Sequence, residues 1–399
     1  MTTLTPLAWD PLDARYKDDP HSVWRRLRDE APLYYNPAHD FYALSRFADV
    51  DAAHRDPKTF SSAHGTVLEF MGPDTNGLGE LMIFLDPPEH TQLRRLVSKA
   101  FTPRRIAVLE ADIRELCANL LDAQMDAGFF DYVQDFGARV PAMVIAALLG
   151  VPAGHREEMR ELIDGTFHFH PEKGMMNEVA ASYMGRLHEY VTVQLTERQN
   201  SPRDDMFTDL LEGEVVEDNG RPRRLTLHEA TMFAILIASA GTETVARLIG
   251  WAGLVLAAHP DQRAELVADP GLIPNTAEEL LRFEAPSPVQ GRWTTADVEL
   301  HGQVIPIDSK VLLITGSAGR DERAFPDADT FDIHRQMHHH VSFGYGVHLC
   351  LGAALARLEG RIALEETLQR IPAWTVDLEA AIPLHTSTVR GYTTLPISF

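Results

Sequence analysis

Cys350 is the residue whose type and surroundings most plainly indicate chemistry. It lies in the glycine-rich stretch SFGYGVHLCLGAALARLE, which runs directly into a strongly helical segment. The other cysteine, Cys117, lies inside a helix-like run, where a small buried hydrophobic side chain is the ordinary role. Around Cys350, glycines let backbone N–H groups turn toward the sulfur, and the following helix points its positive end at it. These features favour a stabilised thiolate that binds a metal.

The number of available ligands decides between possible metal centres. Zinc and iron–sulfur clusters need about four protein ligands, whereas a haem iron is already held by its porphyrin nitrogens and needs only one. A single cysteine therefore favours haem. The histidine run at 338–340, with His334 nearby, lacks the spacing of a zinc site. We expect His340 instead to order the loop before Phe343.

A polar island, SAGTET, lies at 239–244 in the middle of an otherwise apolar segment. Thr226 and Glu229 form a capping-box pattern before this segment, and Pro260 ends it. The pattern predicts a helix of about 32 residues, roughly 48 Å long. Its polar residues interrupt the apolar run, so we do not expect this helix to span a membrane.

Two interpretations of the island stay open. Its glycine, Gly241, costs about 1 kcal/mol relative to alanine, and threonines can bond back to the carbonyl four residues earlier. The helix could therefore carry a notch against which a second helix packs. Alternatively, the island forms a groove that holds a small ligand against the helix.

Helical periodicity dominates the middle of the chain, and strand-like runs are short and lie near its ends. We expect helices at 21–31, 90–101, 106–128, 140–150 and 177–199, and strands within 40–46, 298–315 and 391–399. The segment 59–85 reads as a long loop, and such loops are usually functional. With no linker apparent, residues 1–399 are predicted to form a single, mainly helical domain with small peripheral β-sheets and no fused redox domain.

Composition narrows the class of protein. The chain has 399 residues, 45% of them hydrophobic, and its 36 basic and 58 acidic residues give a net charge of −22. That charge argues against nucleic acid or an anionic membrane as the main partner. The N-terminal stretch has early prolines and acids and no apolar signal-peptide core, and two cysteines without a pairing pattern suit a reducing compartment. A cytoplasmic protein is expected.

The cysteine stretch resembles the F-x-x-G-x-H/R-x-C-x-G motif of the cytochrome P-450 family. The matching residues are Phe343, Gly346, His348, Cys350 and Gly352. The stretch Ala240–Thr244, AGTET, resembles the family's oxygen-activating helix motif. Glu279 and Arg282 resemble its E-x-x-R pair, and Arg335 lies where the family completes that ion-pair cluster. Residues 19–32 and 86–104 resemble its N-terminal segment and the bacterial C helix, so the motifs occur in the family's order.

The resemblance implies haem b, iron protoporphyrin IX, buried between the long helix and the helix after Cys350, with Cys350 as the axial iron ligand. Gly241 would lie beside the ring, and Phe343 would limit solvent near the iron–sulfur bond. The two propionates are anions that need cationic or donor partners. By position, these partners are His90, Arg94, Arg292 and His348.

The resemblance also implies catalytic and substrate-binding residues. Thr244 would hold a water in the groove of the long helix, and Glu243 would gate the entry of protons. Residues 165–176 would form a mobile lid over the entrance. The substrate-facing positions, taken from the family by position, are Val67, Leu68, Phe70, Leu78, Phe167, Phe169, Phe233, Ile237, Val289, Thr388 and Val389.

The expected function is that of a monooxygenase inserting one atom of O₂ into a medium-sized hydrophobic molecule, as in secondary metabolism. Electrons would come from a separate ferredoxin and its NAD(P)H-dependent reductase, and the protein would act as a monomer. An acidic ferredoxin would dock on a basic patch formed by Lys99, Arg104, Arg105, Arg357 and Arg361. The alternatives are oxidative coupling or peroxide-driven oxidation without monooxygenation and, in another class, a non-catalytic haem protein such as a gas sensor.

Overall fold

A computed structural model describes residues 7–16, 19–73, 81–98, 100–168, 170, 174, 177–216 and 220–399. The α-helices are α1 (His21–Glu30), α2 (Phe47–Arg55), α3 (Glu89–Ser98), α4 (Pro103–Ala107), α5 (Glu110–Asp122), α6 (Arg139–Leu149), α7 (Arg156–Thr166), α8 (Glu178–Asn200), α9 (Met206–Glu212), α10 (Leu227–Ala258), α11 (Pro260–Ala268), α12 (Ile273–Phe283), α13 (Thr315–Ala318) and α14 (Ala353–Arg370). The β-strands are β1 (Leu33–Asn36), β2 (Phe41–Leu44), β3 (Phe60–Ser61), β4 (Phe129–Asp131), β5 (Glu214–Val216), β6 (Pro222–Arg224), β7 (Gln290–Thr294), β8 (Val298–Leu300), β9 (Gln303–Ile305), β10 (Lys310–Leu313), β11 (Thr375–Val376), β12 (Ile382–His385), β13 (Arg390–Thr394) and β14 (Pro396–Ser398).

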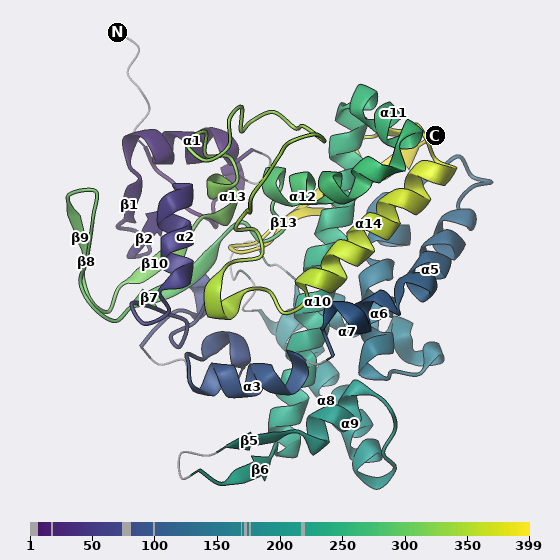
Figure 1. Cartoon of the computed structure of the whole chain (residues 1–399), viewed down its shortest axis with the longest axis horizontal. Coiled ribbons are helices and arrows are strands. Elements are labelled where there is room, and N and C mark those ends of the chain that lie inside the picture. The colour runs from purple at the N-terminus through teal and green to yellow at the C-terminus, as the bar shows by residue number, and fades with distance from the viewer. Residues whose placement is uncertain are drawn as a thin grey trace.

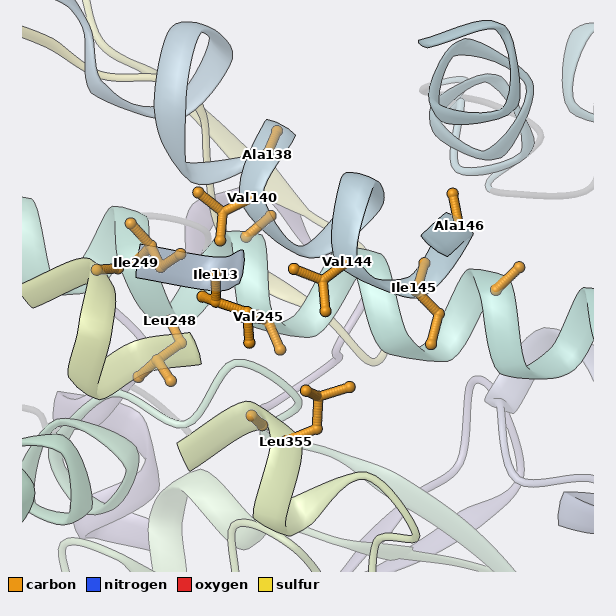
Figure 2. Close-up of a cluster of buried hydrophobic side chains, with 14 of the residues drawn as sticks. Ile113, Ala138, Val140, Val144, Ile145, Ala146, Val245, Leu248, Ile249 and Leu355 are labelled. Carbon is orange, nitrogen blue, oxygen red and sulfur yellow. The ribbon is translucent and has the colours of Figure 1, made fainter. Parts of the chain in front are cut away.

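Helix α10 is the central element of the fold (Figure 1), and the helices packed against it are α6, α7, α8, α9, α11, α12 and α14. It has the 32 residues that the sequence predicts, and Thr226 and Glu229 cap it reciprocally, as expected. Its apolar side chains form one core with those of α6 and α14. Figure 2 shows Ile145 and Val144 of α6 on one side of α10 and Leu355 of α14 on the other. Helix α10 therefore packs against α6 on one side and against α14 on the other.

A five-stranded sheet lies beside the helical part, in the order β1-β2-β10-β7-β3. Strand β10 runs parallel to β2 and antiparallel to β7, with Val311 opposite Arg292. The sheet buries apolar residues of its own and packs near α1 and α2 at the N-terminal end of the chain (Figure 1). Strand β7 thus carries Arg292 into the interior, where it is 5% exposed.

The predicted elements are largely confirmed. The helices expected at 21–31, 90–101, 140–150 and 177–199 are α1, α3, α6 and α8. The segment 106–128 holds the last residues of α4 and the whole of α5, with a break at Val108 and Leu109, so the single helix expected there was wrong. Within 298–315, the chain forms the hairpin β8–β9 and then β10. Helices α2, α7, α9 and α11 were not anticipated.

The pair Glu279 and Arg282 lies on one turn of α12, and both side chains are fully buried. Arg282 donates to both carboxylate oxygens of Glu279, at 2.6 and 2.7 Å, and Arg335 donates to Oε1 at 3.1 Å. The two arginines also donate to backbone carbonyls of residues 319 and 326–330. A buried charge is costly unless it is paired in this way. The cluster therefore holds α12 against the segment 319–335, which precedes the loop that carries Cys350.

Among the residues that the structure describes, two stretches are long and apolar enough to cross a membrane, judged by length and composition: Tyr132–Leu149 and α10. The hydropathy of α10 stays high despite the polar island, so hydropathy alone does not decide whether this helix spans a membrane. In each case 67% of the apolar window is buried inside the protein. Such burial is typical of the core helices of a globular protein.

Candidate active site

The loop before α14 holds Cys350 through a series of short backbone turns. Gly344 donates to Val341 O at 2.8 Å, and Cys350 N donates to Phe343 O at 2.9 Å. Gly344 and Gly346 have φ of 66° and 69°, in the left-handed region that side chains disfavour. At Gly346 a Cβ atom would also come 2.6 Å from the carbonyl oxygen of His54. The glycines are therefore required by the path of this loop.

The two cysteines differ as the sequence predicts. Cys117 is fully buried in the core, and burial raises the pKa of its thiol far above the usual range. Cys350 is exposed, but it faces an internal cavity, and the protein surrounds it closely enough for burial to raise its pKa as well. The backbone N–H of Gly352 and the charges of Arg94 and Arg357 lower the pKa again. Only Cys350 presents its sulfur to a ligand.

A cavity of about 450 Å³ extends from the Cys350 sulfur to α10. Its walls are mainly apolar and come from the cysteine loop, the first turns of α14, the middle of α10, β7 and the loop before α3. Glu243 and Thr244 of the polar island also line it. The thiol and the island thus belong to one continuous space.

Basic side chains cluster along one edge of the cavity. His90, Arg94, Arg292 and His348 all line it, as predicted for the propionate partners. The rings of His90 and His348 lie 4.1 Å apart between centroids. Burial, with nearby arginines, lowers the pKa of His90 to about 4 and that of His348 to about 2, and burial lowers the pKa of Arg292 to about 10. Burial therefore disfavours positive charge on these groups, and the nearby arginines add to this effect at the two histidines.

The cluster fits a dianionic ligand. Within the part of the chain that the structure describes, both ring nitrogens of His90 and Nε2 of His348 are buried without a hydrogen-bond partner. Such atoms are costly unless a ligand or water satisfies them. Two carboxylates would accept from these donors and offset the crowded positive charge. An apolar slot, a single open thiol and a donor set for two carboxylates are together what haem b needs.

Glu243 lines the cavity, but its carboxylate is held by a neighbour on the same helix. Its carboxylate pairs with Arg247 at 2.8 Å, and the two side chains are 4% and 6% exposed. Arg247 also donates to the backbone carbonyl of Tyr392 in β13. Thr244 Oγ1 donates to Ala240 O at 3.0 Å, the back-bond expected of a mid-helix threonine. The sequence left the orientation of Glu243 open, and the structure places it in this buried ion pair.

Gly241 serves helix packing. A Cβ at this position would come 3.2 Å from Ile145 Cδ1, so the missing side chain faces α6 and not the cavity. Ile145 is the side chain lying against α10 in Figure 2. Because the Gly241 residue also lines the cavity, both interpretations of the polar island apply. The helix itself is continuous from Leu227 to Ala258. The contact of Gly241 with a cofactor, which the resemblance implies, stays a prediction.

The structure places some predicted substrate residues at the cavity and others elsewhere. The residues that line it are Val67, Phe167, Ile237, Val289, Thr388 and Val389. Leu68 packs into the hydrophobic cluster around Trp24, and Phe233 packs into the main core, so neither was correctly placed. Phe70 is half-buried outside the cavity wall. Leu78, Phe169 and much of the predicted lid 165–176 lie outside the described residues.

Sequence reasoning missed two polar groups at this site. Arg247 was not singled out, although its spacing of four residues from Glu243 predicts an ion pair on one helix face. Glu359 of α14 lines the cavity, and burial raises its pKa well above the usual value. Nothing in the sequence distinguishes Glu359 from a surface glutamate, because its burial depends on how α14 packs.

Comparison with known proteins agrees with this site. The family model described as Cytochrome P-450 matches residues 3–269 and 271–380. Cytochrome P-450 123 of Mycobacterium tuberculosis is 38% identical over 394 residues, which cover 98% of this chain and 97% of that protein. The vitamin D(3) 25-hydroxylase of Pseudonocardia autotrophica is 35% identical over 408 residues, which cover 100% of this chain and 98% of the relative.

A solved structure extends the likeness to three dimensions. The crystal structure of CYP109E1 from Bacillus megaterium in complex with testosterone has a TM-score of 0.86 and 28% identity, and the match covers 96% of this chain and 98% of that one. The family match, the relatives and the thiol-lined cavity agree, and they confirm the mainly helical fold with small sheets that the resemblance implied. The chain belongs to the cytochrome P-450 family and is a haem monooxygenase of bacterial type.

Proposed function

We propose that Cys350 is the axial ligand of haem b and that the enzyme oxidises a medium-sized hydrophobic molecule. The observation that carries the proposal is the single cavity that joins the Cys350 sulfur to Glu243 and Thr244. His90, Arg94, Arg292 and His348 hold the propionates. Residues 1–399 act as one cytoplasmic domain that receives electrons from a separate donor protein.

The chain's own residues supply the protons. The bound haem supplies the iron that activates O₂, with electron density from the thiolate. Thr244 Oγ1 donates to Ala240 O, so its remaining lone pairs are free to hold a water in the cavity. When Glu243 leaves Arg247, its carboxylate takes up a proton from solvent water and passes it to the water held by Thr244, and Arg247 stabilises the carboxylate again when it returns. The acid is thus shielded in a buried ion pair until it is needed.

The substrate is hydrophobic because the cavity walls are. The apolar contacts come from Val67, Phe167, Ile237 and Val289, and a few polar points lie among them. The polar points include Thr66, Ser239, Gln290 and Thr388. The relatives named above act on or bind vitamin D(3) and testosterone. A rigid, largely apolar molecule with one or two hydroxyl or carbonyl groups suits this lining.

A substrate-binding screen tests this proposal. Vitamin D(3) and testosterone are the first probes, and a ligand that enters the cavity should displace water beside the iron and move the haem Soret band to shorter wavelength. The product formed under ¹⁸O₂ with a ferredoxin and reductase should carry one labelled oxygen. A product without the label would favour oxidative coupling, and turnover with peroxide alone would favour the peroxide-driven alternative.

We expect the electron donor to dock at Arg104 and Arg105, which are exposed on α4, a helix that packs against α14. Two other members of the predicted basic patch are already paired. Arg357 binds Glu278, and Arg361 binds Glu110 and Glu365. Their positive charges are therefore largely neutralised by these glutamates. The docking surface that we propose is accordingly smaller than the basic patch predicted from the sequence. Lys99 lies outside the described residues.

Charge reversal tests the docking surface. The double variant Arg104→Glu/Arg105→Glu should slow reduction by an acidic ferredoxin about tenfold or more, and added salt should slow the wild type, because exposed charges are screened within about 8 Å at physiological ionic strength. Stopped-flow reduction measures both effects. Arg224→Glu, an exposed charge reversal on β6, is the control. A rate indifferent to both salt and the double variant would place the donor elsewhere.

A further inference from the structure

A compact polar cluster lies behind the cysteine loop, outside the cavity. Glu278 of α12 accepts from Arg357 Nε at 2.6 Å and Nη2 at 3.0 Å, and its Oε2 lies 3.1 Å from His340 Nε2. His340 is almost fully buried, whereas Arg357 is 45% exposed. The cluster therefore runs from the protein surface to the interior of the loop and joins α12, α14 and the loop.

The hydrogen bonds fix the state of the histidine. Ser342 N donates to His340 Nδ1 at 3.2 Å, so Nδ1 is the acceptor nitrogen. Nε2 consequently carries the hydrogen and donates to Glu278. Burial alone would raise the pKa of Glu278, but the hydrogen bonds from His340 and Arg357 lower it to about 2. The carboxylate is therefore a fixed anion that both partners need.

The two partners of Glu278 enclose the Phe343 ring. The Arg357 guanidinium lies 4.6 Å from the ring centroid, and the His340 ring centroid lies 5.8 Å from it. The backbone of Phe343 in turn accepts the hydrogen bond of Cys350 N at 2.9 Å. A single hydrogen bond thus couples the position of Phe343 to that of Cys350, the residue that carries the sulfur.

We propose that Glu278, His340 and Arg357 act as one positioning unit that holds Phe343 over the thiolate loop and so sets the electron donation of Cys350. The proposal rests on the proposed function, because it takes Cys350 as the haem ligand. A tightly held ring keeps water from the sulfur. Water that reaches the sulfur donates hydrogen bonds to it, weakens its donation to iron and favours the reduced state.

Positioning and simple charge effects predict different signs. If the unit acts by its charges alone, removing the anion in Glu278→Gln favours reduction, and removing the cation in Arg357→Gln disfavours it. If the unit positions Phe343, either variant releases the ring, and both favour reduction. The double variant then shifts no further than each single variant, because the ring is already released.

The experiment is a spectroelectrochemical titration of the holoenzyme, with the infrared C–O stretch of the ferrous carbon monoxide complex as a second readout. We expect both single variants to raise the ferrous-to-ferric ratio at fixed potential by on the order of tenfold, about 59 mV, and to raise the C–O stretch. Phe343→Leu should shift both readouts in the same direction. Arg26→Gln, which breaks the exposed ion pair with Glu30 on α1, is the control without a shift.

A variant of His340 tests its bond to Glu278 separately from its bond to Ser342. In His340→Asn, the amide oxygen replaces Nδ1 and keeps the bond from Ser342, but the side chain is too short for Glu278, so we expect the shift of Glu278→Gln. Opposite signs for Glu278→Gln and Arg357→Gln, or no shift in either, would overturn the proposal. Because Arg357 is half-exposed, we expect Arg357→Gln to fold normally. The direction of its shift in the ferrous-to-ferric ratio therefore tests the proposal even if the other variants fold poorly. A wild type without the thiolate-type carbon monoxide band would instead overturn the ligand assignment, and this proposal with it.

Discussion

Cys350→Ser is expected to abolish the strongly red-shifted Soret band that the reduced protein gives with carbon monoxide, and Cys117→Ser is expected to keep it. The band requires a thiolate on iron, and a serine hydroxyl has far too high a pKa to replace it. Cys350 is the cysteine that faces the cavity, whereas Cys117 is fully buried in the core. Monooxygenase turnover should fall to background in the Cys350 variant alone.

Two measurements keep this result interpretable. Thermal unfolding should show that Cys117→Ser loses some stability, because a hydroxyl replaces an apolar thiol in a packed core, while its spectrum stays normal. Haem content by pyridine extraction separates loss of the ligand from loss of the cofactor in Cys350→Ser. If the band survived in Cys350→Ser but disappeared in Cys117→Ser, the iron ligand would be Cys117, and its assignment to the loop before α14 would be wrong.

Much of this site could be predicted from local sequence. The glycines around Cys350, the capping box of α10 and the threonines of the polar island form patterns among neighbouring residues. Each pattern predicts a local backbone structure. The order of the family's motifs also predicted that His90, Arg94, Arg292 and His348 lie together at the cavity. In each case the residues concerned lie close together in the chain or in a known motif.

The errors have a common physical origin. Leu68 and Phe233 are apolar residues in the expected segments, but which face of a turn meets the cavity depends on the packing of other elements. Arg357 appeared free because its partner, Glu278, lies 79 residues earlier in the sequence. Long-range packing settles such details, and periodicity alone does not.

Thr244→Ala and Glu243→Gln are expected to fail in different ways. Thr244→Ala leaves the haem ligand and the Glu243–Arg247 pair in place, so oxygen still binds and electrons still flow. Without the hydroxyl, the water that delivers protons is no longer held, and hydrogen peroxide should leave in place of oxidised product. NADH consumption should stay substantial while product per NADH falls about tenfold or more. Parallel assays of NADH, peroxide and product measure this.

Glu243→Gln removes the acid but retains an amide oxygen that can accept from Arg247. The whole cycle should slow, because positioned acids and bases contribute about 100- to 10,000-fold. The solvent isotope effect on turnover should increase, since proton delivery becomes the slow step. Product per NADH should fall less than in Thr244→Ala.

Neighbouring residues supply the controls. Thr242→Ala removes the same atoms one position before Glu243, where the hydroxyl is buried, bonds back to Ala238 O at 2.8 Å and does not line the cavity. It should couple normally, and Thr244→Ser should restore much of the coupling lost in Thr244→Ala. In a peroxide-driven enzyme, Thr244→Ala would hardly change the peroxide-supported rate. Full coupling in Thr244→Ala would show that a hydroxyl on the substrate holds the water, and the threonine would then have no part in proton delivery.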